Sequence, residues 1–394
     1  MIPHPLGSRS RAEVHAIAIP CAEEIARLAC TASNEDAAQR TASNAKLTVP
    51  RARRVEAPRG LEAVNAYCQE RKWSDGLPLI PPTEERVERM LRNTSRSRDE
   101  KIGVIAPSFG VATIERIAIN AVLAGCVPDH LPVLIAAVQA VTAPEFNLQS
   151  IQTSTHPAAV WMILNGPVAA RLGVNATFNC LGQGYSANAT LGRALRLIMQ
   201  NIGGAFPGDM DRSTHGQPGK YSFCCAENEA ASPWPPLHVE RGFSAEQSTV
   251  TVVGAAGTLN LNPHPKDADE MVRAIGSSMA YGTSNDYRLV GAPWIILGPE
   301  SADFFREDKW TKEKLKRGLW EASKMQGREM TLMDLERTRQ GRASELGEID
   351  ADTWLPVSAR PEEIGILVAG GPGSHHCVYV PSFGDTRAVT REIL

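Results

Sequence analysis

Four short apolar runs in this chain of 394 residues have the length and the borders of buried β-strands. Each run is rich in Val, Ile, Leu or Trp and is bounded by glycine, proline or asparagine. Short runs that are apolar at consecutive positions are typical of strands covered on both faces. These runs are residues 158–167, 248–257, 292–301 and 363–376.

Between the runs, apolar residues recur every three or four positions, which predicts helices. Residues 111–126 show this spacing clearly, and Gly125 is placed to act as a C-terminal cap. Thr83 is a suitable N-terminal cap for another helix. Further helices are predicted at residues 61–73, 83–94, 127–142, 187–204, 267–280 and 311–325.

Alternating strands and helices predict an α/β architecture with a mostly buried mixed sheet. Some segments also resemble each other. Residues 159–172 and 292–305 both read as strand, Gly-Pro and helix, and Pro-Ser-Phe-Gly occurs at residues 107–110 and 381–384. The similarity predicts an internal pseudo-repeat of two halves; chance similarity at a common kind of boundary is the alternative.

The chain length suggests two or three domains at about 150 residues each, or one large domain. Residues 1–58 are polar and lack sustained periodicity, so we expect a partly ordered N-terminal arm. Residues 59–325 form the expected main α/β domain. We expect a variable linker or insertion at residues 326–360, and a strand and loop that complete the fold at residues 361–394.

The composition limits the classes of partner. The chain is 43% hydrophobic and 22% charged with a net charge of -3, which is ordinary for a soluble protein and does not suggest nucleic-acid binding. No run of about 18 apolar residues predicts a membrane span, and the N-terminus lacks a secretory pattern. We expect a cytoplasmic homo-oligomer with a small-molecule substrate, no nucleic-acid or membrane partner, and free thiols at its eight cysteines.

One short segment concentrates reactive groups. His215, Lys220, Tyr221 and Glu227 lie close together in the chain, and Gly-Gln-Pro-Gly between the first two predicts a loop. In the catalytic hypothesis, these four residues line one pocket. Lys220 stabilises an anion, Tyr221 transfers a proton and Glu227 acts as a base. The alternative is a surface loop with a salt bridge.

Cys126 is a further candidate catalytic residue. It stands just before a predicted helix and four residues from His130, an environment that lowers the pKa of a thiol. The adjacent Cys224 and Cys225 follow Lys220 by a few residues. The alternative for each cysteine is a small buried apolar residue.

Candidate substrate-binding residues lie at glycine-rich turns and strand ends. Gly182 and Gly184 precede a helix whose N-terminal amides can hold an anion, or they form only a tight turn. Gly371 and Gly373 follow the last predicted strand and let the backbone approach a ligand. Neither GxGxxG nor GxxxxGK[ST] occurs, so we expect no NAD, FAD or ATP.

Ligands of open α/β sheets bind beyond the carboxyl ends of the strands. Asn165 follows the first predicted strand, and His375 follows the last. If these strands are parallel in one sheet, His375 or His376 shares a pocket with Lys220; otherwise the histidines are solvated. His156 is a further candidate for substrate binding.

The histidines and cysteines show no HxxxH, HExxH or CxxC spacing, which are the patterns that indicate a metal site. No cofactor is therefore predicted. A metal ion held by residues that only the fold brings together stays open as an alternative.

Several motifs in this chain are distinctive, among them WSDGLPLIPPTEERVERML, TSTHP, ANATLGRALRLIMQNIGG and HGQPGKYSFC. They resemble a poorly characterised bacterial family, the selenoprotein-like group named for its Sec-Gly-Ser-Cys (UGSC) motif. The resemblance covers about residues 60–300 and 363–394. The Sec-Gly-Ser-Cys motif itself is absent from this chain, and the resemblance implies little about activity.

These observations predict an enzyme that acts on a small polar or anionic metabolite. The expected chemistry is of lyase or hydrolase type, with acid and base groups and with or without a thiolate, at a carbon–heteroatom bond. A metal-dependent enzyme with scattered His and Cys ligands is one alternative. A non-catalytic binding or assembly subunit is the other.

Overall fold

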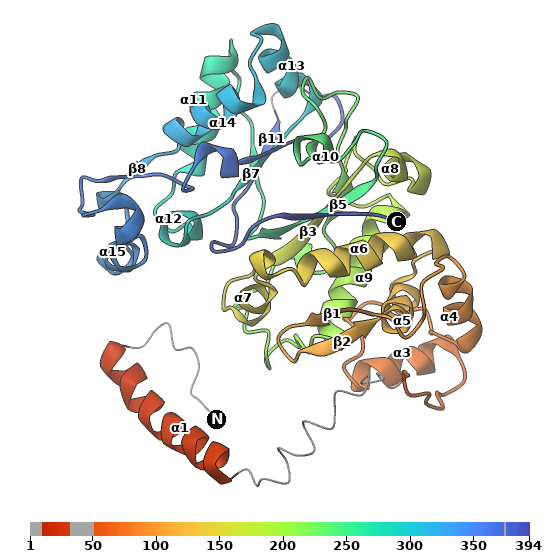
Figure 1. Ribbon diagram of the computed structural model, residues 1–394. Helices are drawn as coiled ribbons and strands as arrows, with labels where there is room; N and C mark the ends of the chain where they lie inside the picture. Colours follow the sequence, from red (N-terminus) through yellow and green to blue (C-terminus); the bar gives the residue numbers. More distant parts are fainter. Residues whose placement is uncertain (1–9, 32–50, 374–375) are drawn as a thin grey trace. The chain divides into compact units, whose positions relative to one another are not determined.

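The structure is a computed structural model that describes residues 10–31, 51–373 and 376–394. It divides the chain into two units, Met1–Arg51 and Ala52–Leu394. The first unit contains helix α1 (Arg11–Thr31), which lies within the expected N-terminal arm. The second unit contains the remaining described elements and both sheets discussed below (Figure 1).

Two four-stranded mixed sheets form the centre of the second unit. The first sheet has the strand order β12-β5-β3-β4 and the second has the order β10-β7-β11-β6. The first comprises β3 (Ala159–Asn165), β4 (Cys224–Ala226), β5 (Thr249–Ala255) and β12 (Val389–Glu392). The second comprises β6 (Leu259–Leu261), β7 (Trp294–Leu297), β10 (Gly365–Val368) and β11 (Cys377–Val380). Two smaller ladders pair β1 (Lys101–Ile105) with β2 (Gly110–Thr113), and β8 (Met325–Gln326) with β9 (Trp354–Leu355).

The strand pairing confirms the predicted α/β class. In the first sheet, β3 is parallel to β4 and antiparallel to β5; in the second, β7 is parallel to β10 and antiparallel to β11. Each sheet receives one edge strand from the chain segment that follows a strand of the other sheet. Strand β5 belongs to the first sheet, but the next strand, β6, pairs with β11 in the second. Strand β11 belongs to the second sheet, but the next strand, β12, pairs with β5 in the first. This shared pairing pattern does not by itself confirm the predicted pseudo-repeat.

Side chains that alternate along the strands face two different layers. Val160 and Met162 of β3 pack with the apolar residues of helices α5, α6 and α9. Trp161, between them, faces the other way and packs against Trp294 of the second sheet, with ring centroids 5.7 Å apart. The far face of the second sheet packs against α11, α13 and α14. The layers are therefore helices, sheet, sheet and helices.

The regular apolar spacing predicts the helices well. Thr83 caps α4 by accepting a hydrogen bond from the backbone N–H of Arg86 at 3.4 Å, and Gly125 ends α5 in the left-handed conformation. The helices are α3 (Leu61–Glu70), α4 (Glu84–Leu91), α5 (Ile114–Ala124), α6 (Leu131–Val141), α7 (Leu148–Thr153), α8 (Pro167–Leu172), α9 (Ser186–Asn201), α10 (Leu237–Glu240), α11 (Ala268–Met279), α12 (Asn285–Leu289), α13 (Pro299–Glu307), α14 (Lys312–Ala322) and α15 (Leu332–Leu346).

Residues 326–360, expected as a linker or insertion, contain α15 and β9. Arg342 of α15 is 1% exposed and donates hydrogen bonds to the carbonyl oxygens of Tyr287 and Pro356, both at 2.8 Å. A guanidinium this deeply buried holds the segment in place through its hydrogen bonds. The segment is therefore an ordered part of the second unit.

Helix α6 lies in the core beside the first sheet, and its apolar side chains are almost all buried. In the part of the chain that the structure describes, no single helix is long and apolar enough to cross a membrane. One pair, Pro128–Val141 with Pro144–Thr153, reaches the required length only as two helices bent by 76°.

Candidate functional site

A cleft of about 580 Å³ lies between helix α9, the loop at residues 73–78 and the segment at residues 207–221. Three of the predicted catalytic residues, His215, Lys220 and Tyr221, line this cleft. It is also lined by Ser74, Asp75, Arg196, Asp211 and Ser213. The structure therefore brings together the polar groups that the glycine- and proline-rich loop carries, with partners from other parts of the chain.

The loop that carries these residues is anchored to strand ends. The side-chain Nε2 of Gln217 donates to the carbonyl oxygens of Pro157, Ala255 and Ala256, at 2.5, 3.1 and 3.0 Å. The chain then makes one 3-10 turn over Pro218–Lys220 and enters β4, which pairs with β3. Lys220 is thus held on a fixed part of the fold instead of on a free surface loop.

Lys220 is the central titratable group of the cleft. Its side chain is 15% exposed, and its Nζ donates to Asp211 Oδ2 and to Ser213 Oγ, both at 2.6 Å. Burial lowers the pKa of Lys220 below its ordinary value, and the neighbouring Arg196 lowers it further, although Asp211 opposes both effects. The ammonium group therefore releases its proton more readily than an exposed lysine does.

Asp211 balances the positive charge in the cleft. Burial by itself raises the pKa of this carboxyl, but hydrogen bonds from Lys220 and Ser213 outweigh burial, and the pKa of Asp211 falls below its ordinary value. Arg196 lies nearby, with Nη2 3.8 Å from Asp211 Oδ2. One carboxylate thus faces two cationic side chains, which leaves an excess of positive charge at this wall.

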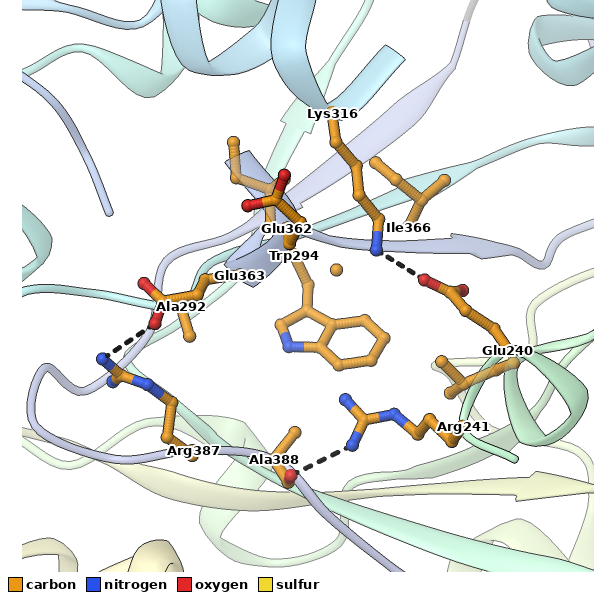
Figure 2. Close-up of a pocket in the computed structure, with 13 residues that line it drawn as sticks. Glu240, Arg241, Ala292, Trp294, Lys316, Glu362, Glu363, Ile366, Arg387 and Ala388 are labelled. Atoms are coloured by element: carbon orange, nitrogen blue, oxygen red, sulfur yellow. Dashed lines mark hydrogen bonds and ion pairs between the residues drawn. The ribbon is translucent and has the colours of Figure 1, made fainter. Parts of the chain in front are cut away.

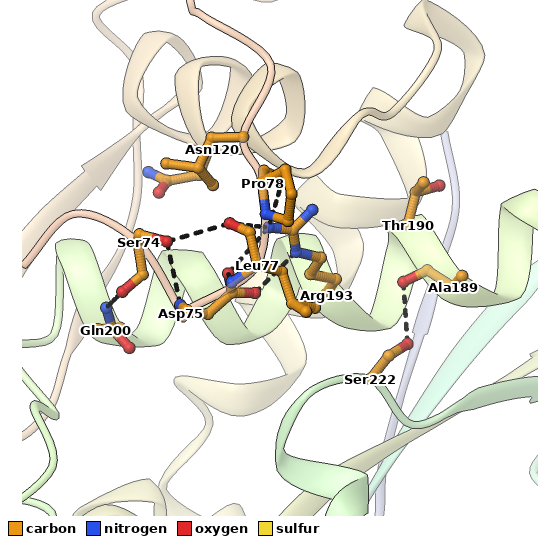
Figure 3. A network of polar contacts seen from close by, with 12 residues as sticks. Ser74, Asp75, Leu77, Pro78, Asn120, Ala189, Thr190, Arg193, Gln200 and Ser222 are labelled. Carbon is orange, nitrogen blue, oxygen red and sulfur yellow. Dashed lines mark hydrogen bonds and ion pairs between the residues drawn. The ribbon is translucent and has the colours of Figure 1, made fainter. Parts of the chain in front are cut away.

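Another part of the cleft wall is the loop at residues 73–78, which α9 holds in place (Figure 3). Arg193 binds the Asp75 carboxylate with two hydrogen bonds, Nε to Oδ2 at 2.7 Å and Nη2 to Oδ1 at 2.8 Å. The same guanidinium donates to the carbonyl oxygen of Pro78 at 2.9 Å, and Gln200 donates to that of Ser74 at 3.0 Å. A bidentate pair of this kind fixes orientation, so the wall is rigid and Asp75 is already neutralised.

His156 meets the site through its backbone. Ser213 Oγ donates to the carbonyl oxygen of His156 at 3.1 Å, while the His156 ring lies 5.5 Å from that of Phe383. Burial lowers the pKa of His156, which keeps its ring neutral. The predicted substrate contact of the His156 ring stays a prediction.

Tyr221 is 52% exposed and stands at the open side of the cleft.

Glu227 and Asn165 do not line this cleft, so the expected four-residue pocket is divided between two places. Asn165 ends β3, and its Nδ2 donates to Glu227 Oε2 at 2.5 Å. Glu227 follows β4 and is 5% exposed, and this burial raises its pKa to about 7. The separation arises because β4 carries the chain from the cleft to the other end of the sheet.

The side chain of Cys126 is half-buried and packs against the apolar core. Its Sγ donates to the carbonyl oxygen of Thr190 at 3.3 Å, and burial raises its pKa to about 12. Burial also raises the pKa of Cys224. The pKa of Cys225 is raised mainly by its hydrogen bond with Cys180 and, to a smaller extent, by burial. These thiols are protonated at neutral pH, so they do not support thiolate chemistry.

The candidate glycines Gly182, Gly184, Gly371 and Gly373 do not line the cleft either. Gly184 has a φ of 115°, which a turn into α9 requires, and Gly371 packs directly against the ring of Phe178. Backbone geometry thus explains the glycine at position 184, and close packing explains the glycine at position 371.

The expectation that Asn165 and His375 meet at one crevice rested on a single parallel sheet. That premise is wrong, because β3 and β10 belong to different sheets. His375 itself lies outside the described residues. His376 is exposed, and its Nδ1 is 3.3 Å from Nδ2 of Asn260, away from the cleft of Lys220.

Trp294 is among the residues that line a second hollow, of about 240 Å³ (Figure 2). Charged side chains ring it, but they are largely paired: Lys316 with Glu240 at 2.5 Å, and Arg387 with Glu363 at 3.4 Å. Ion pairs of this kind are common structural features and leave little unsatisfied charge. The cleft that contains Lys220 is therefore the stronger candidate.

Asp211, Ser213 and Arg196 are among the groups of this cleft that sequence reasoning missed. Asp211 and Ser213 lie just before the predicted loop, so extending that segment by four residues would have included them. Arg196 lies within a predicted helix, and nothing in its spacing connects it with Lys220.

No protein-family model matches this chain, and no curated protein matches it. Among the described residues, no three or more His, Cys, Asp or Glu side chains are grouped so that they could hold a metal ion.

Proposed function

We propose that the protein is an enzyme that binds a small anionic metabolite in this cleft and transfers protons through Lys220. The reaction type is that of a lyase or hydrolase at a carbon–heteroatom bond. The observation that carries the proposal is the ammonium group of Lys220, 2.6 Å from both Asp211 and Ser213 and facing a cleft. A titratable group shifted by burial and a charged partner is typical of catalytic sites.

The charge and size of the cleft favour the substrate class. Lys220 and Arg196 together exceed the charge of Asp211, so a carboxylate or phosphate is attracted to this wall. The volume of about 580 Å³ lies within the range of small-molecule sites, which is about 300–1,000 Å³.

The chemistry follows from the hydrogen bonds of Lys220. In its protonated form, Lys220 donates a proton to a leaving heteroatom or stabilises negative charge that develops on the substrate. Asp211 and Ser213 hold the ammonium group in one orientation. The neutral amine that remains is the base for the reverse proton transfer. Tyr221 and His215 supply further polar contacts at the opening.

A screen for turnover of small carboxylates and phosphates, read by mass spectrometry, tests the proposal. With a substrate in hand, Lys220→Met should lower kcat by at least about 100-fold, the usual contribution of a proton-transfer group, with a smaller effect on KM. Lys266→Met is the matched control, because the Lys266 side chain is 73% exposed.

Full turnover by Lys220→Met would overturn the assignment of Lys220. Stoichiometric binding of an anion without turnover by the wild-type protein would instead support a non-catalytic binding subunit.

A further inference from the structure

Five buried polar atoms without a hydrogen-bond partner among the described residues belong to four side chains at one end of the first sheet. They are Asn165 Oδ1, Glu227 Oε1, Thr249 Oγ1 and both ring nitrogens of His238. Asn165, Thr249 and His238 are 0% exposed and Glu227 is 5% exposed. Buried polar atoms almost always have a partner in the protein, in water or in a bound ion, so this concentration requires an explanation.

The strand register places these side chains next to one another. Asn165 and Thr249 are direct partners across β3 and β5, so their side chains stand on the same face. Asn165 Nδ2 reaches Glu227 Oε2 at 2.5 Å and Glu229 Oε1 at 3.1 Å. His238 Nδ1 lies 3.8 Å from the same Glu229 oxygen. We call these five residues the strand-end cluster.

Among the described residues, neither carboxyl group of the strand-end cluster forms an ion pair with a lysine or an arginine. Its two carboxyl groups, those of Glu227 and Glu229, both accept hydrogen bonds from Asn165. The cation that acts on Glu227, Lys312, is itself bonded to Glu240 at 2.7 Å. The other oxygen of Glu227, Oε1, is buried and has no hydrogen-bond partner among the described residues.

We propose that the strand-end cluster is a binding site for a divalent cation. Carboxylate, amide and hydroxyl oxygens suit hard cations, and an imidazole nitrogen shifts the preference towards Mn²⁺, Fe²⁺ or Zn²⁺. His, Asp and Glu side chains alone do not complete a metal site among the described residues. The proposed site therefore needs the unpartnered oxygens of Asn165 and Thr249 as additional ligands.

Solvent reaches the strand-end cluster through Glu229, whose side chain is 31% exposed, whereas the other four members are buried. Glu229 Oε1 also accepts the backbone N–H of Gly166 at 2.7 Å, so this entry point has a fixed position. The site is separate from the cleft of Lys220, and the proposal does not depend on the function assigned to that cleft.

Isothermal titration of the full chain, first stripped with EDTA, tests the proposal with Mn²⁺ and Zn²⁺ separately. We expect one equivalent of at least one of these ions to bind and to raise the melting temperature. Glu227→Gln and His238→Gln should each weaken metal binding by at least about tenfold. Substitution of residues that only hydrogen-bond to a metal ligand already lowers metal affinity by about 10- to 100-fold. Thr249→Val, which keeps the side-chain shape, should weaken binding too.

Glu307→Gln is the matched control, because Glu307 is exposed at the end of α13 and should bind metal as the wild type does. Circular dichroism of each variant establishes that it is folded. The proposal is overturned if neither ion binds the stripped wild-type protein. It is also overturned if all three cluster variants bind as the wild type does, or if a crystal structure grown with Mn²⁺ shows only water in the cluster.

Discussion

Replacing Glu227 by Gln measures the cost of burying this carboxylate in the metal-free protein. Glu227 Oε2 accepts hydrogen bonds from Asn165 at 2.5 Å and from the backbone N–H of Leu237 at 2.7 Å. The carbonyl oxygen of glutamine can accept both bonds, and its NH₂ group occupies the position of the unpartnered Oε1. The substitution thus removes the titration while it keeps the shape.

The magnitude follows from the pKa. Burial raises the pKa of Glu227 from 4.5 to about 7, and each pH unit of difference corresponds to about 1.36 kcal/mol, so the total is about 3 kcal/mol. Because the folded state holds the proton more tightly than the unfolded state, this stability is fully present below pH 4.5. It is lost as the pH rises to about 7.

Urea unfolding in EDTA, at intervals from pH 5 to pH 8.5, measures this effect as the difference between variant and wild type. The difference cancels the titration of other groups, including that of Asp286, a buried carboxyl whose pKa burial raises to about 6. We expect Glu227→Gln to gain stability relative to the wild type with rising pH, up to about pH 7, and to keep that gain above it. A difference that is independent of pH would refute the reasoning.

Three further substitutions test the packing and the polar contacts that shape the fold. Arg193→Lys cannot make the bidentate pair with Asp75 and should lower the free energy of unfolding by about 1.5–3 kcal/mol in urea titrations; an unchanged midpoint would argue against a rigid wall. Gly365→Ala places a Cβ against the ring of Trp294 and should cost about 1–3 kcal/mol, seen as a lower melting temperature together with altered tryptophan fluorescence. Arg342→Met leaves two buried carbonyl oxygens without a donor and should cost at least about 1–3 kcal/mol, so wild-type melting would contradict the anchoring of α15.

The amino-acid pattern by itself determined most of the local structure. The apolar runs ending at glycine or proline became β3, β5, β7 and β10, and the regular apolar spacing became the main helices. The caps at Thr83 and Gly125 formed as expected, since they depend only on neighbouring residues. The grouping of His215, Lys220 and Tyr221 was also local, because one Gly- and Pro-rich segment carries all three.

Only the tertiary structure decided which strands pair and which distant groups meet. Nothing in a short run of apolar residues specifies its partner strand, so the placement of β3 and β10 in separate sheets could not be read from the sequence. Glu227 is only seven residues from Lys220, yet the pairing of β4 with β3 carries it beyond the far end of the strand. Arg196 meets Asp211 because α9 packs beside the first sheet, and such long-range packing is what sequence periodicity does not encode.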